Sequence, residues 1–338
     1  MPADRPDRPP TIRDVAALAG VSKSLVSLVL INDPRVSETR RQAVEAAIAE
    51  LDYRPNLRAR ALSRRRTDSV GVLINDLGNP WFIDLLAGLA TTLHSAGLAP
   101  ILADGATDRR IGVASVDTFL RQDVDGLVVV GQTLEEGAII AAATDLPVVL
   151  AGTREPALPK GDIVVNDDLA GAASAARHLI ELGHTRIAHL RGPGEIGRLR
   201  LKGFQATLAD AGLDPERYLE SGGLNEDSGG AAARRLLTRR DRPTAIFAYN
   251  DMSAIGCLSA ADDLDLSVPG DVSLVGYDNT YLARIRHISL TSVDNGNFGV
   301  GAQAGRFMVE RIANPDLPAR LHLVPSTLEV RGSTAPPT

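Results

Sequence analysis

The residues of this sequence best equipped for chemistry are cationic and lie near the N-terminus. Residues 1–66 hold 13 Lys and Arg against 8 Asp and Glu, a net charge of +5, whereas residues 67–338 hold 23 against 34, a net charge of −11. Arginines are densest in the stretch NLRARALSRRR (56–66). Lys and Arg neutralise phosphates, so this asymmetry favours a module that contacts DNA, joined to an acidic body.

The sequence shows no motif for catalysis or for metal binding. We find no Walker-type phosphate loop, no GxSxG elbow and no HExxH motif. Cys257 is the only cysteine, which excludes an internal disulfide and a thiolate zinc site built from one chain. We expect Cys257 to be a small buried hydrophobic residue. The sequence therefore predicts a binding protein with no cofactor, no metal and no catalytic residues.

The basic segment has the pattern of three short helices within residues 11–54. Thr11 can cap the first helix, and Gly20 interrupts the helical spacing. Ser22 can cap a second helix and Ser37 a third. The short Ala-Gly-Val-Ser corner between the first two is typical of a helix-turn-helix. We expect a small all-α domain whose three helices share one core.

Beyond the basic segment, β-rich apolar runs alternate with helical stretches. Continuous apolar runs are typical of strands buried on both faces, so this alternation predicts an α/β fold with parallel, doubly wound sheets. The pattern restarts halfway, which favours two similar lobes. Ligands of such sheets bind beyond the carboxyl ends of the strands. The runs are SVGVLIN (69–75), LAPILA (98–103), DGLVVVG (125–131) and PVVLAG (147–152), then IVVN (163–166), RIAHL (186–190), TAIFAYN (244–250) and VSLVGYD (272–278).

No part of the sequence predicts a membrane segment or a secretion signal. No run approaches the roughly 18 apolar residues that span a bilayer. The opening MPADRPDRPP lacks the apolar centre of a signal peptide. We expect a folded, cytoplasmic protein with no membrane partner.

Motifs along nearly the whole chain resemble the LacI/GalR family of regulators. TIRDVAALAGVSKSLVSLVL (11–30), VSETRRQAVEAAIAELDYRPN (36–56) and ARALS (59–63) resemble its headpiece. The pieces GVLINDLGNPWF (71–82), RLKGF (200–204), AYNDMSAIG (248–256) and VSLVGYD (272–278) match in the same order. The resemblance implies a sequence-specific transcriptional regulator, a repressor by family default. It would bind a pseudo-palindromic operator in double-stranded DNA as a homodimer, with a tetramer left open, and respond to a small-molecule effector.

The resemblance also implies the domain organisation. A disordered tail (1–10) would precede the helix-turn-helix domain (11–55) and a hinge helix or linker (56–66). The effector-binding and dimerisation core (67–331) would resemble periplasmic binding proteins, and residues 332–338 would form a second tail. Three crossovers near residues 165, 293 and 324 would divide the core. The N-lobe would hold about 67–164 and 294–323, and the C-lobe about 165–293 and 324–331.

The resemblance assigns DNA contacts to the headpiece. Lys23, Ser24 and Leu28 match exposed positions of the second helix that read bases, where Lys23 could donate to guanine and Leu28 could contact a thymine methyl group. A solvated lysine and a core leucine are the alternatives. Two residues depart from the family pattern, and both bear on which bases the protein would prefer. Leu25 stands where threonine is usual, and Ile31 stands where asparagine is common. The positions that match phosphate contacts, some of which capping alone would explain, are Thr11, Ser22, Ser37, Tyr53 and Asn56.

Residues 56–66 resemble the hinge helix of the family. Ala59 and Leu62 match its minor-groove positions, where the leucine inserts between base steps and bends the duplex. A core leucine is the alternative for Leu62. A helix of about eight residues is too short to be stable alone, and its arginines repel one another until phosphates neutralise them. Because such a wedge acts as a pair, the resemblance implies a homodimer.

The resemblance also assigns an effector site between the lobes. Arg200, Asn250 and Asp278 match ligand-binding positions, and together they offer the donors and acceptors that a polyhydroxylated ring requires. A surface ion pair, a helix cap and a turn residue are the respective alternatives. Trp81 and Phe82 match aromatic residues that stack on the effector, unless they only pack beneath the loop. Further matched positions are Asn166, which with Asp167 reverses the Asp-Asn order common in the family, and Asn297.

Three other functions compete with this interpretation. A sugar is the favoured effector, and a purine or nucleoside acting as corepressor is the alternative within the family. A solute-binding protein for transport would share the two lobes but would need a signal peptide and has no use for residues 11–66. An enzyme would turn over its bound ligand. For the regulator we expect effector binding to change lobe closure and headpiece spacing together.

Overall fold

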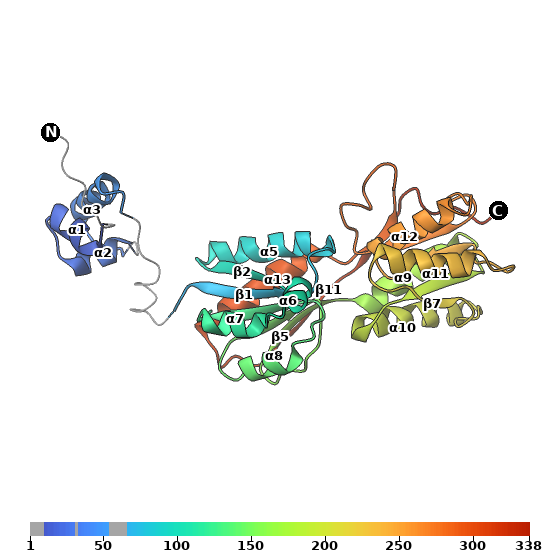
Figure 1. Cartoon of the computed structure of the whole chain (residues 1–338), viewed down its shortest axis with the longest axis horizontal. Helices are drawn as coiled ribbons and strands as arrows, with labels where there is room; N and C mark the ends of the chain where they lie inside the picture. Colours follow the sequence, from blue (N-terminus) through green and yellow to red (C-terminus); the bar gives the residue numbers. More distant parts are fainter. Residues whose placement is uncertain (1–9, 31–32, 54–65) are drawn as a thin grey trace. The chain divides into compact units, whose positions relative to one another are not determined.

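The computed structural model describes residues 10–30, 33–53 and 66–338, which fall into two compact units, one up to Thr67 and one from Asp68 onward (Figure 1). The predictions for Ile31, Asn56, Ala59 and Leu62 lie outside the described residues, as does most of the two segments expected to be a tail and a hinge.

The described part of the first unit contains the helices α1 (Ile12–Leu18), α2 (Lys23–Leu30) and α3 (Glu38–Glu50). They pack around a small core in which Val15, Val26 and Val44 are completely buried. The apolar residues recur at helical spacing, so each helix turns one face inward. This arrangement confirms the predicted three-helix domain.

Local hydrogen bonds explain where these helices begin. The backbone N–H of Thr11 donates to Asp14 Oδ2 over 2.8 Å, and the Thr11 hydroxyl donates to the same oxygen over 2.7 Å. The Ser22 hydroxyl accepts from the Leu25 N–H ahead of α2. Ser37 occupies the N-cap position of α3, but its side chain makes no capping bond. Gly20 has a φ of +63° in the turn after α1, a conformation that favours glycine.

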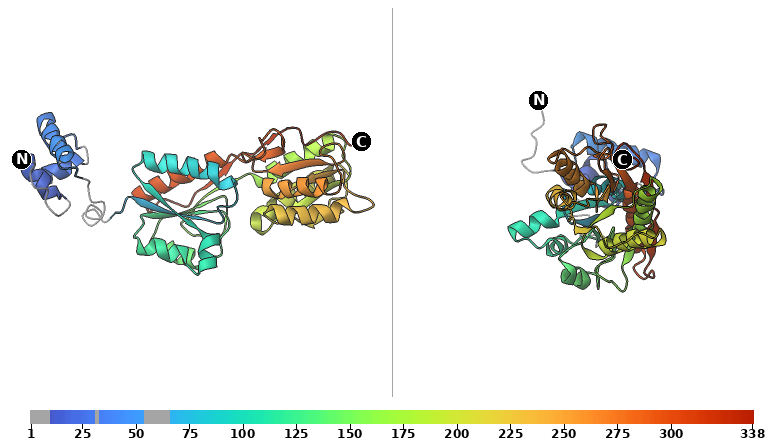
Figure 2. Two further views of the ribbon diagram at one scale, coloured as in Figure 1. Left: turned by 45° about the horizontal axis from the view of Figure 1, so that its top comes forward. Right: turned by 90° about the vertical axis from the view of Figure 1, so that its right-hand side faces the viewer.

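Residues 66–338, all of which are described, contain two six-stranded sheets, and the first is entirely parallel. Helices α5 (Trp81–Ser95) and α13 (Asn297–Ala313) cover one of its faces, and α7 (Ser115–Arg121) and α8 (Glu136–Ala142) the other (Figure 2). A further helix, α6 (Gly105–Ile111), follows β2. The strands in spatial order are β11 (Leu321–Val324), β5 (Asp162–Asn166), β4 (Val148–Ala151), β3 (Gly126–Val130), β1 (Ser69–Ile74) and β2 (Ala99–Asp104).

The second sheet repeats this plan, with one antiparallel strand. Helices α9 (Asp168–Glu181) and α10 (Gly194–Asp210) pack on one face, and α11 (Glu226–Leu237) and α12 (Asp251–Asp262) on the other. Only β12 runs antiparallel to its neighbour β10. The strands in spatial order are β12 (Thr327–Glu329), β10 (Thr291–Asp294), β9 (Ser273–Tyr277), β8 (Ala245–Phe247), β6 (Ile187–Arg191) and β7 (Leu219–Ser221).

The structure confirms the doubly wound α/β architecture and corrects two predictions about its strands. The IVVN run does not begin the second sheet, because β5 pairs with β4 and β11 in the first sheet. The LAPILA run is not buried on both faces, because β2 is an edge strand whose residues are half-buried or exposed. Four strands were not predicted, namely β7, β10, β11 and β12, each only three or four residues long.

The chain passes between the two sheets at three places. It leaves the first sheet after β5, returns to it after β10 and leaves it again between β11 and β12. In both sheets the residues that follow the carboxyl ends of the parallel strands lie at this junction. A crevice at the carboxyl ends of parallel strands is where open α/β sheets bind ligands.

Two expectations from composition concern the buried thiol and the membrane. Cys257 is buried on α12, as predicted, and burial raises the pKa of its thiol to about 12. Among the described helices none is long and apolar enough to cross a membrane.

Candidate effector cavity and DNA-reading surface

A cavity of about 440 Å³ lies where the two sheets meet, a volume typical of small-molecule sites. Loops that follow β1, β3 and β4 of the first sheet line it, together with the loops that follow β6, β8 and β9 of the second. Of the residues predicted from the resemblance, six line the cavity: Trp81, Phe82, Asn166, Arg200, Asn250 and Asp278.

Arg200 forms the polar centre of the cavity wall. It lies on α10 and is 5% exposed, so it is not a surface residue. Its Nε donates to Asp168 Oδ1 over 2.9 Å, and its Nη1 donates to the Tyr249 carbonyl over 2.6 Å. Its Nη2 lies 3.7 Å from Asp278 Oδ1. The guanidinium also lies 3.6 Å from the ring centroid of Tyr277, a cation–π contact that orients it further.

Burial and charge act against each other in this cluster. Burial by itself lowers the pKa of Arg200, but the attraction of Asp168 and the electrostatic contributions of neighbouring groups outweigh burial and raise the pKa above its ordinary value. For Asp278 burial raises the pKa well above its ordinary value, and Arg200 opposes this only in part. The site therefore holds one guanidinium that is permanently charged and already has an anionic partner.

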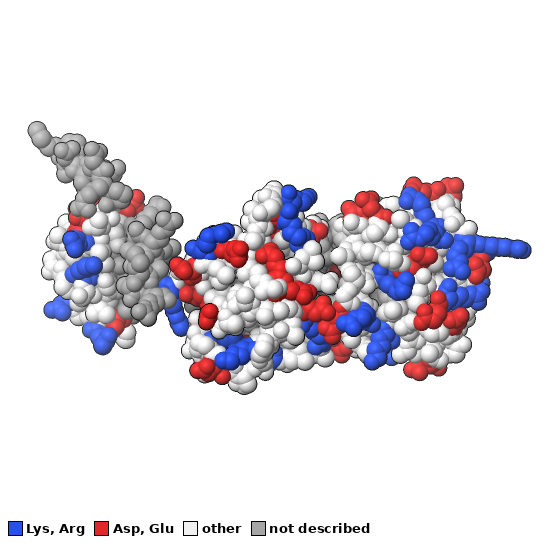
Figure 3. Space-filling model, turned by 60° about the horizontal axis from the view of Figure 1, so that its bottom comes forward, with Lys and Arg blue, Asp and Glu red and all other residues white. Residues whose placement is uncertain are grey.

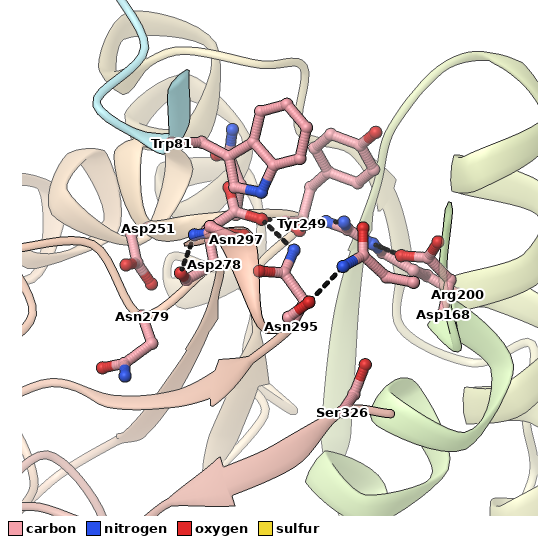
Figure 4. Close-up of polar contacts among 12 residues, drawn as sticks. Trp81, Asp168, Arg200, Tyr249, Asp251, Asp278, Asn279, Asn295, Asn297 and Ser326 are labelled. Carbon is pink, nitrogen blue, oxygen red and sulfur yellow. Dashed lines mark hydrogen bonds and ion pairs between the residues drawn. The ribbon is translucent and has the colours of Figure 1, made fainter. Parts of the chain in front are cut away.

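Aromatic side chains form the opposite wall. Trp81 and Phe82 begin α5, and their rings meet edge to face with centroids 5.0 Å apart. A Cβ atom on Gly152 would lie 2.3 Å from the Trp81 ring, so glycine at this position makes room for the indole. The Trp81 Nε1 atom is buried and has no hydrogen-bond partner. Figure 4 shows the indole facing the polar groups of the site.

The asparagines of the predicted site differ in what they can offer a ligand. Asn250 caps α12, because its Oδ1 accepts from the Ser253 N–H over 2.8 Å and its Nδ2 donates to the Leu224 carbonyl. The helix-cap alternative for Asn250 is therefore confirmed, although the residue also lines the cavity. Asn297 is buried at the start of α13, does not line the cavity and donates to the carbonyl of the cavity-lining Asp278, so its pocket-facing place stays a prediction.

Asp278 is hydrogen-bonded to the segment that crosses between the sheets after β10. Its Oδ1 accepts from Asn295 Nδ2 over 3.1 Å, and its carbonyl accepts from Asn297 Nδ2 over 2.9 Å. The Asn295 carbonyl in turn accepts from Asn166 Nδ2 on β5 (Figure 4). Asp278 therefore joins the cavity directly to one crossover, and through Asn295 to a second.

Several residues of the site were not predicted from the sequence. Asp168, Tyr249, Tyr277 and Asn295 carry much of its geometry. Asp168 could have been considered, because it lies two residues beyond the carboxyl end of β5, where ligands of parallel sheets bind. Asp167, which was considered instead, caps α9 by accepting from the Ala170 N–H. Among the described residues no group of His, Cys, Asp and Glu could hold a metal ion.

Of the three residues of α2 that were predicted to read bases, two are exposed to solvent. Lys23 and Ser24 are exposed at its first turn. Leu28 is half-buried against the headpiece core, which corrects the expectation of an exposed side chain. Ser27 is exposed one turn after Lys23 and was not predicted. On the face shown in Figure 3, Lys and Arg side chains lie over this unit with few carboxylates between them.

The predicted phosphate contacts also differ in exposure. Ser22 and Ser37 are exposed at the starts of α2 and α3, and Thr11 is half-buried. Tyr53 belongs to the core of the unit, and burial raises the pKa of its hydroxyl. Its ring therefore packs within the domain.

Two family models match the two units separately. Residues 11–56 match the bacterial regulatory proteins of the lacI family, and residues 176–334 match the periplasmic binding protein-like domain. A DNA-binding helical unit joined to a two-sheet sensor defines a class of transcriptional regulator. The chain belongs to the lacI family of bacterial regulatory proteins.

Individual relatives agree with this assignment over the full chain. The ribose operon repressor of Escherichia coli (strain K12) is 35% identical over 329 residues, which cover 96% of this chain and 99% of the relative. The lac repressor dimer bound to operator and the anti-inducer ONPF superimposes with a TM-score of 0.82 at 28% identity, covering 97% of this chain and 100% of that one. The transcriptional regulator CelR in its cellobiose complex superimposes with a TM-score of 0.71 at 30% identity, covering 96% of this chain and 99% of that one.

Proposed function

We propose that this protein is a transcriptional repressor that binds a pseudo-palindromic operator as a homodimer and responds to a sugar held in the core cavity. The observation that carries the proposal is Asp278, which lines the cavity and is hydrogen-bonded to the crossover segment after β10. A ligand at Asp278 can thereby favour one arrangement of the two sheets over another, which is what an effector must do.

The DNA-reading part of the proposal concerns α2. Lys23 and Ser24 are exposed at its first turn, the part of a recognition helix that meets base edges. A lysine there can donate to guanine, and Leu28 can present the uncovered part of its side chain to a thymine methyl group. The hydroxyl groups of Ser22 and Ser37 lie at helix N-termini, where phosphates bind well.

The hinge part of the proposal concerns residues 56–66. We assign minor-groove contacts to Ala59 and Leu62 and a phosphate contact to Asn56. Two hinges on one operator require two chains, and the lac repressor neighbour is a dimer on its operator. A protein with this function acts in the cytoplasm, where the bacterial chromosome lies.

The effector part of the proposal rests on the two walls of the cavity. Trp81 and Phe82 offer aromatic edges and faces to the apolar side of a sugar ring, and the cluster around Arg200 offers polar groups to its hydroxyls. The CelR neighbour is a cellobiose complex, and the ribose operon repressor is a relative. The proposal assigns no catalytic role to the site, so a bound sugar is expected to be recovered unchanged.

The DNA-binding claim is tested by selection from duplexes with a randomised centre, followed by gel-shift titration at fixed salt. We expect a pseudo-palindrome to be enriched. Lys23→Ala should weaken binding to the selected duplex about tenfold, the cost of one good base contact. Leu62→Ala should weaken it more than about tenfold and leave sugar affinity unchanged. The matched control is Lys202→Ala, because Lys202 is exposed on α10 of the core.

Equal affinity of the Leu62→Ala variant and the unchanged protein would contradict the hinge assignment. The sensor claim is tested by thermal shift with ribose and with cellobiose, followed by DNA titration with each sugar that binds. A sugar that binds without changing DNA affinity would contradict the coupling through Asp278.

A further inference from the structure

The cavity is lined by far more acidic than basic residues. Of its lining residues, all of them described, seven are Asp or Glu and one is Arg, and none is Lys or His. Asp168 and Asp278 lie deep in the wall and are 1% and 5% exposed. Asp76, Glu226 and Asp227 are exposed at its edge. A concave site lined by one sign of charge attracts ligands of the opposite sign and repels those of its own.

The single guanidinium cannot reverse this balance. Arg200 is paired with Asp168 through Nε and with the Tyr249 carbonyl through Nη1, and its third nitrogen faces Asp278. The Tyr277 ring lies against the guanidinium at 3.6 Å. An anionic ligand that accepted from Nη2 would lie against the carboxyl group of Asp278. One that displaced Asp168 from Nε would leave a buried carboxylate without its charge partner.

Two arginines outside the cavity are also paired, with carboxylates that line it. Arg154 Nε lies 3.9 Å from Glu195 Oε1, and Arg198 Nη2 lies 4.0 Å from Glu155 Oε1. Both glutamates line the cavity, and neither arginine does. Phosphate sites in proteins use Arg forks, Lys ammonium groups or helix N-termini, and carboxylates at a helix N-terminus occupy its positive end and repel a phosphate. The N-terminus of α11, which adjoins this cavity, carries Glu226 and Asp227.

One buried oxygen shows what the ligand must supply. Asp168 lines the cavity, and while its Oδ1 accepts from Arg200, its Oδ2 is buried with no hydrogen-bond partner. A buried carboxylate oxygen without a partner costs free energy, which a donor from the ligand would recover. Neither a fully ionised phosphate group nor a carboxylate can donate to it.

We infer that the effector of this protein is a polyhydroxyl compound with no phosphate or carboxylate group, and that one of its hydroxyls donates to Asp168 Oδ2. This inference rests on the proposed effector function and narrows it to unphosphorylated sugars. It also makes Asp168 a specificity-determining residue, because its free oxygen accepts a donor and repels an anion.

The test compares sugars with their own phosphates by isothermal titration calorimetry on the full-length protein. The pairs are ribose with ribose 5-phosphate, galactose with galactose 1-phosphate and glucose with glucose 6-phosphate, at low and at high salt. We expect at least one neutral sugar to bind and its phosphate to bind at least about tenfold more weakly, with the difference shrinking at high salt. Tighter binding of any phosphate than of its neutral partner would overturn the inference and leave the effector function standing. Binding by no member of any pair would contradict the effector function itself, and the inference with it.

Two variants separate the inner carboxylate from the outer ones. Asp168→Asn keeps an acceptor for Arg200 but turns an amide toward the ligand. It should therefore weaken binding of the neutral sugar about tenfold and reduce the ratio of its affinity to that of the sugar phosphate. Unchanged DNA affinity without sugar shows that this variant is folded. The double variant Glu226→Gln, Asp227→Asn should reduce this affinity ratio several-fold. The control is Asp262→Asn, because Asp262 is exposed on the same lobe, and it should leave the ratio unchanged. An affinity ratio that is the same in both variants as in the unchanged protein would overturn the assignment of specificity to these carboxylates.

Discussion

Arg200 and Asp168 form a buried ion pair in the wall of the effector cavity, with Arg200 Nε 2.9 Å from Asp168 Oδ1 and both side chains almost inaccessible to solvent. The pair joins α10 to the start of α9 within one lobe. Because each charge needs the other, the residues that form the ligand site also stabilise the lobe that carries it.

Replacing Arg200 should therefore destabilise the protein as well as abolish ligand binding. Arg200→Met leaves Asp168 buried without its cation, which costs roughly 3 to 5 kcal/mol in the free energy of unfolding. Urea unfolding of the core measures this loss. The matched control is Arg198→Met, two residues earlier on α10, where the side chain is 73% exposed and the change should stay within about 0.5 kcal/mol. Similar losses in both variants would contradict the importance of the buried pair.

Close packing of α5 against α13 depends on glycine. A Cβ atom on Gly301 would lie 1.9 Å from the Leu85 carbonyl, whereas one on Gly299 of the same helix would meet nothing closer than 3.9 Å. Gly301→Ala should destabilise the core by about 1 to 3 kcal/mol, because the helices must move apart. Gly299→Ala should be neutral or stabilising by up to about 1 kcal/mol. Thermal unfolding of the two variants distinguishes them, and equal melting temperatures would contradict this account.

Asp251 should make the protein less stable as pH rises from about 4 to 6. Burial raises the pKa of this carboxyl to about 6, although Ser292 and Thr280 donate to it and Arg331 attracts it. The folded state therefore keeps a proton that the unfolded chain, with an ordinary pKa near 4, has already released. Stability is lost as pH rises through this window.

The measurement is the free energy of unfolding between pH 4 and 6 for the unchanged protein and for Asp251→Asn. The difference between the two should change by up to about 3 kcal/mol across the window, in favour of the variant at the higher pH. A difference that stays constant with pH would show that Asp251 does not titrate there.

His189 should produce the opposite dependence on pH. Its ring is fully buried, stacked on Phe247 and close to Phe204, and burial lowers its pKa to about 3. The unfolded chain takes up a proton below pH 6.5 that the folded protein refuses, so stability is lost as pH falls from 6.5 toward 3. Relative to His189→Phe, the unchanged protein should lose roughly 4 kcal/mol over that range. Parallel unfolding curves for the two proteins would contradict the prediction.

The sequence by itself determined the features that depend on neighbours along the chain. The α1 cap by Thr11 and Asp14, the buried faces of the headpiece helices and the long apolar strands all follow from contacts within a few residues. Motifs such as RLKGF also indicated that Arg200 would belong to a site, and Arg200 lines the cavity. These predictions held because spacing and capping depend on local geometry.

The tertiary structure alone decided how distant segments combine. It assigned β5 to the first sheet, paired it with β11 and brought Asp168 rather than Asp167 beside Arg200. It also linked Asn166 to the Asn295 carbonyl, 129 residues away, and Asn297 to the Asp278 carbonyl. Such pairings depend on packing between elements far apart in the chain, and nothing in the local pattern of residues encodes which oxygen is left without a partner.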